Sequence, residues 1–170
     1  MFKYASMILI LSGFLFGGMY LASLQRKKTD IINGILLMIS VIETQLRYAC
    51  LPVNDLIRIL CGTEKLSGLR FLHLCKEKLD KNKPFPEAWK CSVEECDELC
   101  RMLGKHKDYL TGLGSDIGTT DLEGQLGCCE YYKQIFKKEL AVREENSKKY
   151  SKVYPALGLM LGVSAAIIIV

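Results

Sequence analysis

The sequence lacks charge near both of its ends. No charged side chain lies between Lys3 and Arg26, a run of 22 residues, and none follows Lys152, a run of 18 residues. Apart from Lys3, every Lys, Arg, Asp and Glu lies between Arg26 and Lys152. A helix needs about 20 apolar residues to cross a hydrocarbon core roughly 30 Å thick. The missing charge therefore predicts transmembrane helices at residues 4–25 and 153–170, the second at the short end of the required length.

The basic residues beside these runs predict the topology of the chain. Basic residues stay on the cytoplasmic side of a membrane. They follow the first run and precede the second, at Arg26, Lys27, Lys28, Lys148, Lys149 and Lys152. We therefore expect a two-pass protein of the cell membrane, with residues 26–152 in the cytoplasm and both termini outside. A cleaved signal peptide is the alternative for the first run, although Arg26 to Lys28 form a poor flank for export.

Small residues recur at a spacing of four in both runs. They form the patterns Gly13-x-x-x-Gly17 and Gly158-x-x-x-Gly162. Such spacing aligns small residues on one helix face and lets two helix backbones approach closely. The patterns predict helix–helix contact, either within one chain or between copies in a homo-oligomer. Neither run contains a charge, so nothing indicates an ion pathway.

The sequence has little of what catalysis requires. Its two histidines, His73 and His106, lie on different predicted elements, and neither is accompanied by a nucleophile and a carboxylate. The glycine-rich stretch 112–118 has no Gly-Lys-Ser/Thr after it and no strand before it, so it is not a phosphate-binding loop. We therefore predict no enzymatic activity and no cofactor. The net charge of +4 is too mild to indicate nucleic acid, which we do not expect as a partner.

Eight cysteines are present, but no Cys-x-x-Cys pair is. Structural zinc sites usually need two such close pairs. Reduced thiols in a cytoplasmic domain behave as small apolar residues, which is the interpretation we favour. The densest group, Cys91, Cys96 and Cys100 with His106 downstream, leaves an alternative function open. In that alternative the chain is a membrane-tethered metal or redox sensor.

The region between the uncharged runs has the periodicity of helices. Apolar residues spaced by three and four predict a helix over residues 30–48, and no strong breaker separates it from the first span. Shorter helices are expected over 54–60, 67–79 and 86–89. Two capping boxes, Ser92 to Glu95 and Thr120 to Glu123, predict the start of later helices. The last of these runs from Asp121 through Leu140 towards the second span.

No segment has the pattern of a β-strand, and the glycine-rich stretch from Gly112 to Gly118 predicts tight turns between helices. The predicted fold is therefore all-α. It is a cytoplasmic helical bundle at residues 26–152, flanked by an N-terminal transmembrane helix at 4–25 and a C-terminal one at 153–170.

Several short motifs, taken in order, cover nearly the whole chain. They are Leu24-Gln25-Arg26, the stretch from Leu37 to Tyr48, Leu51-Pro52, Phe85 to Trp89, Leu113-Gly114, Asp121 to Gln125, Lys149-Tyr150 and Leu157 to Gly162. In content and order they resemble the stage III sporulation protein AB family of endospore-forming bacteria. That family is in turn similar to the cytoplasmic bundles of type II secretion inner-membrane platform proteins.

The resemblance implies a function and a set of partners. We expect a non-enzymatic platform subunit of a secretion-like channel complex between mother cell and forespore. Its expected partners are the other membrane components of that complex, membrane lipid and a cytoplasmic motor ATPase on the mother-cell side. Positions implied to shape the bundle or dock a partner are Glu43, Tyr48, Pro52, Trp89, Gly114, Asp121 and Gln125.

Overall fold

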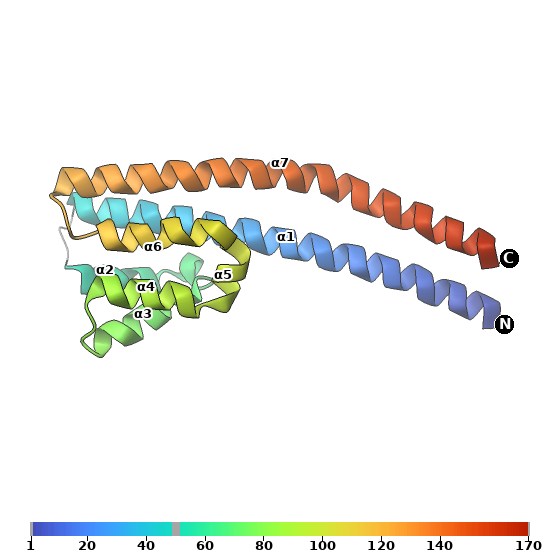
Figure 1. Cartoon of the computed structure of the whole chain (residues 1–170), viewed down its shortest axis with the longest axis horizontal. Helices are drawn as coiled ribbons and strands as arrows, with labels where there is room; N and C mark the ends of the chain where they lie inside the picture. The colour runs from blue at the N-terminus through green and yellow to red at the C-terminus, as the bar shows by residue number, and fades with distance from the viewer. Residues whose placement is uncertain (1, 49–51, 170) are drawn as a thin grey trace. The chain divides into compact units, whose positions relative to one another are not determined.

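A computed structural model describes the backbone of residues 2–48 and 52–169. Side chains are described at residues 17, 20, 23–24, 26–48, 52–147 and 160, so Cys50 and Leu51 lie outside the described residues. Every regular element in this part is helical (Figure 1). In chain order these are α1 Phe2–Tyr48, α2 Val53–Gly62, η1 Glu64–Leu66, α3 Arg70–Asp80, α4 Phe85–Glu95, α5 Asp97–Leu103, η2 Gly104–His106, α6 Lys107–Asp116 and α7 Leu122–Ile169. The all-α prediction is confirmed.

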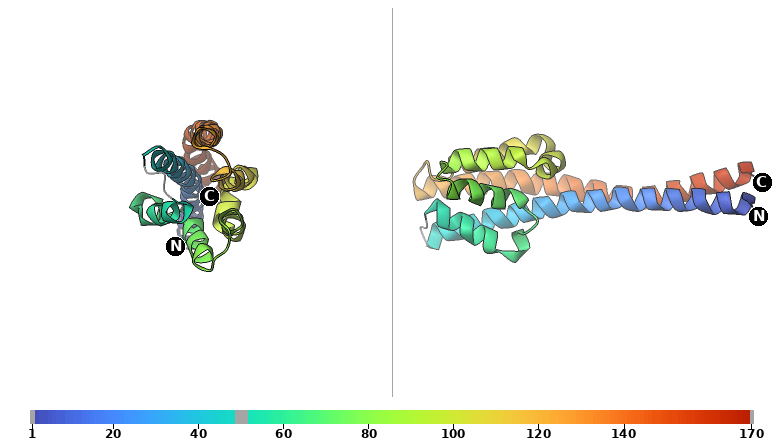
Figure 2. Two further views of the ribbon diagram at one scale, coloured as in Figure 1. Left: turned by 90° about the vertical axis from the view of Figure 1, so that its left-hand side faces the viewer. Right: turned by 90° about the horizontal axis from the view of Figure 1, so that it is seen from below.

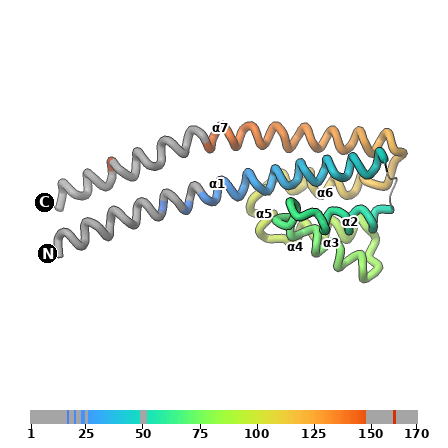
Figure 3. The backbone as a smooth tube through the Cα atoms, turned by 180° about the vertical axis from the view of Figure 1, so that it is seen from behind, coloured from blue at the N-terminus to red at the C-terminus, as the bar shows by residue number. Residues whose placement is uncertain are grey.

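The chain divides into two compact units. One contains residues 1–29 and 141–170, and the other, which we call the bundle, contains residues 30–140. In the bundle, α2 to α6 lie along residues 30–48 of α1 and residues 122–140 of α7 (Figure 3). Seen end-on in the left panel of Figure 2, these segments surround a common centre. The bundle is therefore a closed ring of helices with one core.

Specific contacts close this ring. Helix α2 packs on α3, α3 on α4, and α4 on α6. The hydroxyl of Tyr132 in α7 lies over Gly112 in α6, and Lys133 in α7 forms an ion pair with Glu43 in α1. Leu69, just before α3, lies against Gly34 of α1. Each long helix thus has neighbours in the bundle from distant parts of the sequence.

The predicted apolar stripe of α1 is the centre of the core. Ile32, Ile35, Ile39 and Ile42 are fully buried, and Ile31, Leu36 and Leu46 pack beside them. The stripe follows the helical repeat of 3.6 residues, which is why periodicity alone located it. Helix α1 runs unbroken from Phe2 to Tyr48, which confirms that the first uncharged run and the bundle helix are continuous. Helix α7 likewise passes through Pro155 without a break.

One sequence-based prediction about a helix start is wrong. Ser92 does not begin a helix, because it lies inside α4 and its Oγ donates a hydrogen bond of 2.6 Å to the Ala88 carbonyl oxygen. Helix α4 begins earlier, at Phe85, and continues past Trp89 to Glu95. The chain breaks instead at Cys96, between α4 and α5. A buried serine can satisfy its hydroxyl within its own helix, so the capping-box pattern was misleading here.

The second capping box has a different cap from the one predicted. The carboxylate Oδ1 of Asp121, not the hydroxyl of Thr120, accepts a hydrogen bond of 3.0 Å from the amide of Gly124. The side-chain amide of Gln125 then donates to the carbonyl oxygen of Thr120 at 2.8 Å. Aspartate is among the best N-cap residues because its carboxylate accepts the free amides of the first turn. The predicted start of the helix is still correct to one residue.

The glycine-rich stretch is only partly a turn. Gly112 and Gly114 lie inside α6, and Gly124 and Gly127 lie inside α7. Only Gly118 is in the connection, where its φ of 84° is in the left-handed region that glycine adopts at little cost. Gly112 and Gly114 had been predicted as turn residues because nothing in the local sequence shows that they lie beneath large side chains.

Membrane crossing receives limited support from the described residues. One helical stretch among them, Arg26–Tyr48, is long and apolar enough to span, with a mean hydropathy of 1.3. Its isoleucines form the bundle core, and a core helix meets the same criterion of length and composition. The stretch does not coincide with the predicted spans, and the predicted C-terminal span is not confirmed.

Candidate functional site

Trp89 and Gly114, far apart in sequence, meet in the core. Trp89 is fully buried, and its indole Nε1 donates a hydrogen bond of 2.8 Å to the carbonyl oxygen of Leu110 in α6. The rings of Phe71 and Phe85 pack against the indole, with centroids 5.1 and 5.5 Å away. A Cβ at position 114 would lie 2.1 Å from Cδ1 of Trp89, so only glycine fits. These two residues shape the bundle and are not accessible to a partner.

Four other predicted positions lie at one end of the bundle, where α1 ends and α2 and α7 begin (Figures 1 and 2). A Cβ added to Gly118, in the connection to α7, would lie 3.6 Å from the side chain of Val53. The connection therefore lies close to the start of α2. We call this end the tip and define it by Tyr48, Pro52, Asp121 and Gln125. Tyr48 is 83% exposed, Pro52 and Asp121 are exposed, and Gln125 is half-buried.

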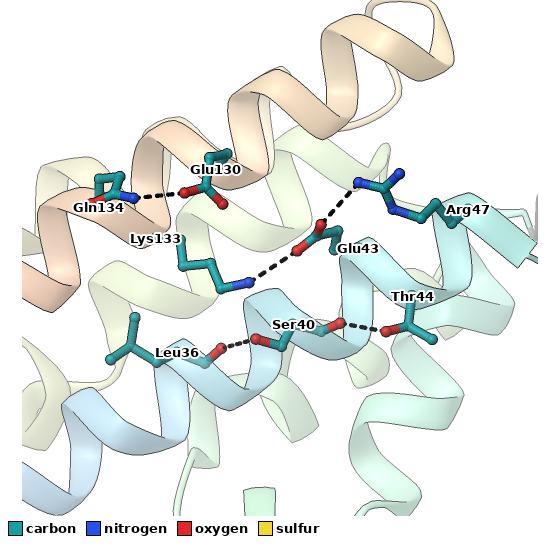
Figure 4. A network of polar contacts seen from close by, with 8 residues as sticks. All are labelled: Leu36, Ser40, Glu43, Thr44, Arg47, Glu130, Lys133 and Gln134. Carbon is teal, nitrogen blue, oxygen red and sulfur yellow. Dashed lines mark hydrogen bonds and ion pairs between the residues drawn. The ribbon is translucent and has the colours of Figure 1, made fainter.

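Glu43 is the centre of a polar network between α1 and α7 (Figure 4). Its Oε2 accepts a hydrogen bond of 3.0 Å from Nζ of Lys133, and its Oε1 accepts one of 3.2 Å from Arg47. The side chains of Glu43 and Lys133 are 22% and 20% exposed, so water screens the pair only in part. Lys133 and then Arg47 lower the pKa of Glu43 below its ordinary value. The network holds the two long helices in one register.

Sequence reasoning missed two polar contacts to α7. The hydroxyl of Tyr132 donates to Oδ2 of Asp116 at 2.7 Å, and burial, with Asp116, raises the pKa of that hydroxyl. Nε2 of His106 lies 3.4 Å from Glu139, with both side chains largely covered. Tyr132 lies in the helix predicted from Asp121 through Leu140, but its partner Asp116 lies on another helix. No local signal links residues 16 and 33 positions apart.

Comparison with known families decides the identity of the chain. The family model described as stage III sporulation protein AB matches residues 3–170. The chain belongs to this family. No curated protein and no solved structure matched in the corresponding searches.

Membership in the stage III sporulation protein AB family supports a role in sporulation and confirms the resemblance found in the motifs. The family's description names a stage of sporulation and no enzymatic reaction.

The seven described cysteines are free thiols; Cys75, Cys96 and Cys129 are buried in the core, and Cys61 and Cys128 pack against it. In the described part of the chain no three His, Cys, Asp or Glu side chains come together as a metal site requires. Cys96 caps α5, and Sγ of Cys100 donates to the carbonyl oxygen of Val93 at 3.2 Å. Burial raises the pKa of Cys75 to about 12 and that of Cys129 to about 11. Such thiols remain protonated, which makes them poor ligands and nucleophiles.

The glycines of the predicted spans lie within the two long helices. Gly13 and Gly17 are in α1, and Gly158 and Gly162 are in α7. At Gly17, an added Cβ would meet none of the described atoms within 4 Å. The packing role of these four glycines therefore stays a prediction.

Proposed function

We propose that the chain is a non-enzymatic platform subunit of a sporulation-specific, secretion-like channel complex. In this proposal residues 4–25 and 153–170 cross the cell membrane, and the bundle lies in the cytoplasm of the mother cell. There the bundle docks a motor ATPase, and the long helices pass displacement to the membrane components of the complex. The sporulation role comes from family membership.

One observation carries the mechanical part of the proposal. Each uncharged run belongs to the same unbroken helix as a core segment of the bundle, the first in α1 and the second in α7. An α-helix makes its backbone hydrogen bonds within its own segment, so it behaves as a stiff rod. Its length rises by about 1.5 Å per residue. We propose that a displacement of either bundle segment is passed along the same helix to its uncharged run.

The ring of contacts around the core supports transmission by both helices together. The ion pair between Glu43 and Lys133 joins α1 to α7, and Tyr132 joins α7 to α6. Because side chains in a core pack at crystal-like density, the bundle transmits strain rather than absorbing it. A force applied anywhere on the bundle would reach both rods.

The tip is the docking surface that we propose for the motor. It lies where α1 ends and α7 begins. These are the points of the two helices that are separated by the most residues from the uncharged runs. Tyr48 exposes 83% of its surface although it has a large apolar ring. Tyrosine is enriched in protein interfaces, where it often contributes much of the binding energy. Asp121, at the same end of the bundle, supplies an exposed carboxylate.

Gene deletion in the native host tests the platform role. We expect vegetative growth to be normal, engulfment to be completed, and the forespore then to arrest. Complementation with the wild type should restore spores, and Tyr48→Ser should restore far fewer. Tyr109→Ser is the matched control, since Tyr109 is 40% exposed on α6, away from the tip. Normal spores in the deletion strain would refute the platform role.

Reporter fusions test the topology. The turn between α3 and α4 is exposed, and Asn82 within it already has a φ of 61°, so an insertion there disturbs no helix. A reporter at Asn82 should be active only as a cytoplasmic fusion, and one after Val170 only as an external fusion. Cytoplasmic activity at both positions would exclude two membrane crossings.

Binding to the motor is measured with the full chain in lipid nanodiscs. The motor ATPase of the same complex should bind the wild type, and Tyr48→Ser should weaken that binding at least about tenfold, as expected for an interface hot spot. Lys81→Gln, in the exposed turn before α4, is the control and should leave binding unchanged. Equal loss for both variants would place the docking surface elsewhere.

A further inference from the structure

Only one of the two units of the chain has a net positive charge. The bundle has 15 lysines and arginines against 17 aspartates and glutamates, so it is slightly acidic. The unit of residues 1–29 and 141–170 has 8 basic residues against 2 acidic ones. The net charge of +4 is therefore divided very unevenly between the two units. A uniformly basic protein would attract polyanions over its whole surface, and this one does not have that distribution.

Six of those basic residues form two short groups that border the uncharged runs. We call them the basic collar: Arg26, Lys27, Lys28, Lys148, Lys149 and Lys152. No acidic residue lies within either group. Both groups are in helices of the same compact unit, the first in α1 and the second in α7. Arg26 and Lys27 are exposed, and Lys28 is half-buried.

The spacing within the collar favours a partner that surrounds each helix. Consecutive residues of an α-helix are separated by about 100° around its axis, so Arg26 to Lys28 extend over more than half of the circumference. A docked protein contacts one face of a helix, whereas a layer of lipid headgroups encloses it. Lysine and arginine stems also reach along apolar surface to place their charges at headgroup level.

Tyrosines occur beside the collar as well. Tyr20 lies before Arg26 and is 66% exposed, and Tyr150 and Tyr154 lie on either side of Lys152 in the sequence. Tyrosine is enriched at membrane–water interfaces because its ring is apolar and its hydroxyl is polar. The position of these tyrosines agrees with a headgroup layer at the level of the collar.

We propose that the basic collar binds anionic phospholipid headgroups and so gives the protein a preference for membrane regions rich in them. The inference rests on the proposed membrane spans and adds the class of lipid that they select. Clusters of basic residues next to a transmembrane helix attract anionic lipids, and the attraction weakens with salt.

Spin-labelled lipids measure this preference directly. The full chain is reconstituted in phosphatidylcholine bilayers, and the immobilised fraction of spin-labelled phosphatidylglycerol is compared with that of spin-labelled phosphatidylcholine. At low salt we expect phosphatidylglycerol to associate about threefold more strongly, and the ratio to fall towards one near about 0.5 M salt. Equal association of both lipids at low salt would overturn the inference.

Two triple variants locate the effect. Arg26→Gln with Lys27→Gln and Lys28→Gln should lower the ratio, and so should Lys148→Gln with Lys149→Gln and Lys152→Gln. The matched control, Lys81→Gln with Lys83→Gln and Lys90→Gln, removes three exposed charges from the bundle and should leave the ratio unchanged. An equal ratio in the wild type and both collar variants would overturn the inference.

The same experiment separates this inference from the proposed function. If no lipid of either kind is immobilised, the chain does not insert, and the two membrane spans and the collar are both refuted. If lipid is immobilised without preference, the spans stand and only the collar is refuted. Loss of sporulation in the collar variants without a lipid preference would assign the collar to a protein partner and overturn the inference.

Discussion

Two contacts hold the bundle together in different ways. Between α4 and α6, a fully buried tryptophan fills the space over Gly114, and its indole nitrogen donates to a backbone carbonyl. Between α1 and α7, a partly exposed ion pair joins Glu43 to Lys133. The first contact depends on shape and has no room to adjust. The second depends on charge and can re-form after small shifts, because both side chains are long and reach water.

The comparison shows which contact of the bundle is rigid and which one can adjust to small shifts of the helices. Overpacking a well-packed core strains side chains and backbone, whereas a screened ion pair contributes little to stability. The α4–α6 contact therefore fixes the spacing of these two helices, while the α1–α7 contact sets the register of the two long helices. Four sets of substitutions, taken from the largest expected effect to the smallest, test this division.

Gly114→Ala should give the largest effect. Its Cβ would lie 2.1 Å from Cδ1 of Trp89, which is held by Phe71, Phe85 and a hydrogen bond and cannot move aside. We expect a loss of about 2–3 kcal/mol in unfolding free energy, the upper range for overpacking. Trp89 is the only tryptophan, so its fluorescence reports unfolding of this core directly.

The control for this substitution is Gly127→Ala in α7. A Cβ there meets no described atom within 4 Å, and alanine favours a helix by roughly 0.5–1 kcal/mol over glycine. Stability should therefore rise slightly. A similar loss in both variants would mean that the tight contact with Trp89 is not what position 114 requires.

Tyr132 and Gly112 should show coupled effects of intermediate size. Tyr132→Phe removes the hydrogen bond to Asp116 and should cost about 1 kcal/mol. Gly112→Ala places a Cβ 2.6 Å from the Tyr132 hydroxyl but 3.4 Å from the ring, so it should destabilise the wild type and be far better tolerated in the Tyr132→Phe background. Urea unfolding of the two single variants and the double variant measures this coupling. Additive losses would contradict the contact.

Asp121→Ala should cost about 1 kcal/mol, because it removes the N-cap of α7. Thr120→Ala should cost much less, since the Asp121 carboxylate and not the Thr120 hydroxyl accepts the Gly124 amide. Thermal unfolding followed by circular dichroism distinguishes the two. A larger loss for Thr120→Ala would restore the capping box that the sequence had predicted.

Glu43→Gln should have the smallest effect, about 0.5 kcal/mol at neutral pH. Because Lys133 and Arg47 lower the pKa of Glu43 below its ordinary 4.5, the pair contributes fully above that value. The contribution is lost as the pH falls through the lowered pKa. The stability difference between wild type and Glu43→Gln should therefore shrink below about pH 4.5. A difference that grows at acid pH would reverse the assigned sign.

Much of the fold was predictable because it depends on local periodicity. The apolar stripe from Ile32 to Ile42 correctly predicted the bundle segment of α1. The pattern after Asp121 correctly predicted α7. The errors concern residues whose role depends on distant neighbours. Ser92 has the sequence of a cap but lies inside a helix, and Gly112 and Gly114 look like turn residues but lie beneath Tyr132 and Trp89.

The candidate site divides in the same way. Motif order was enough to indicate the family, and the family match confirmed it. It was not enough to separate Trp89 and Gly114, which are buried against each other, from Tyr48 and Asp121, which are exposed at the tip. A motif identifies which residue types occur in which order. It does not show whether they pack in the core or contact a partner.

By itself the sequence determined the all-helical class, the family, and the two uncharged runs with basic residues beside them, because composition and periodicity are properties of neighbouring residues. Only the tertiary structure decided that Glu43 meets Lys133 across 90 residues and that Gly114 is needed beneath Trp89. Such contacts depend on how helices pack in three dimensions, and packing brings together side chains whose separation along the chain carries no local signal.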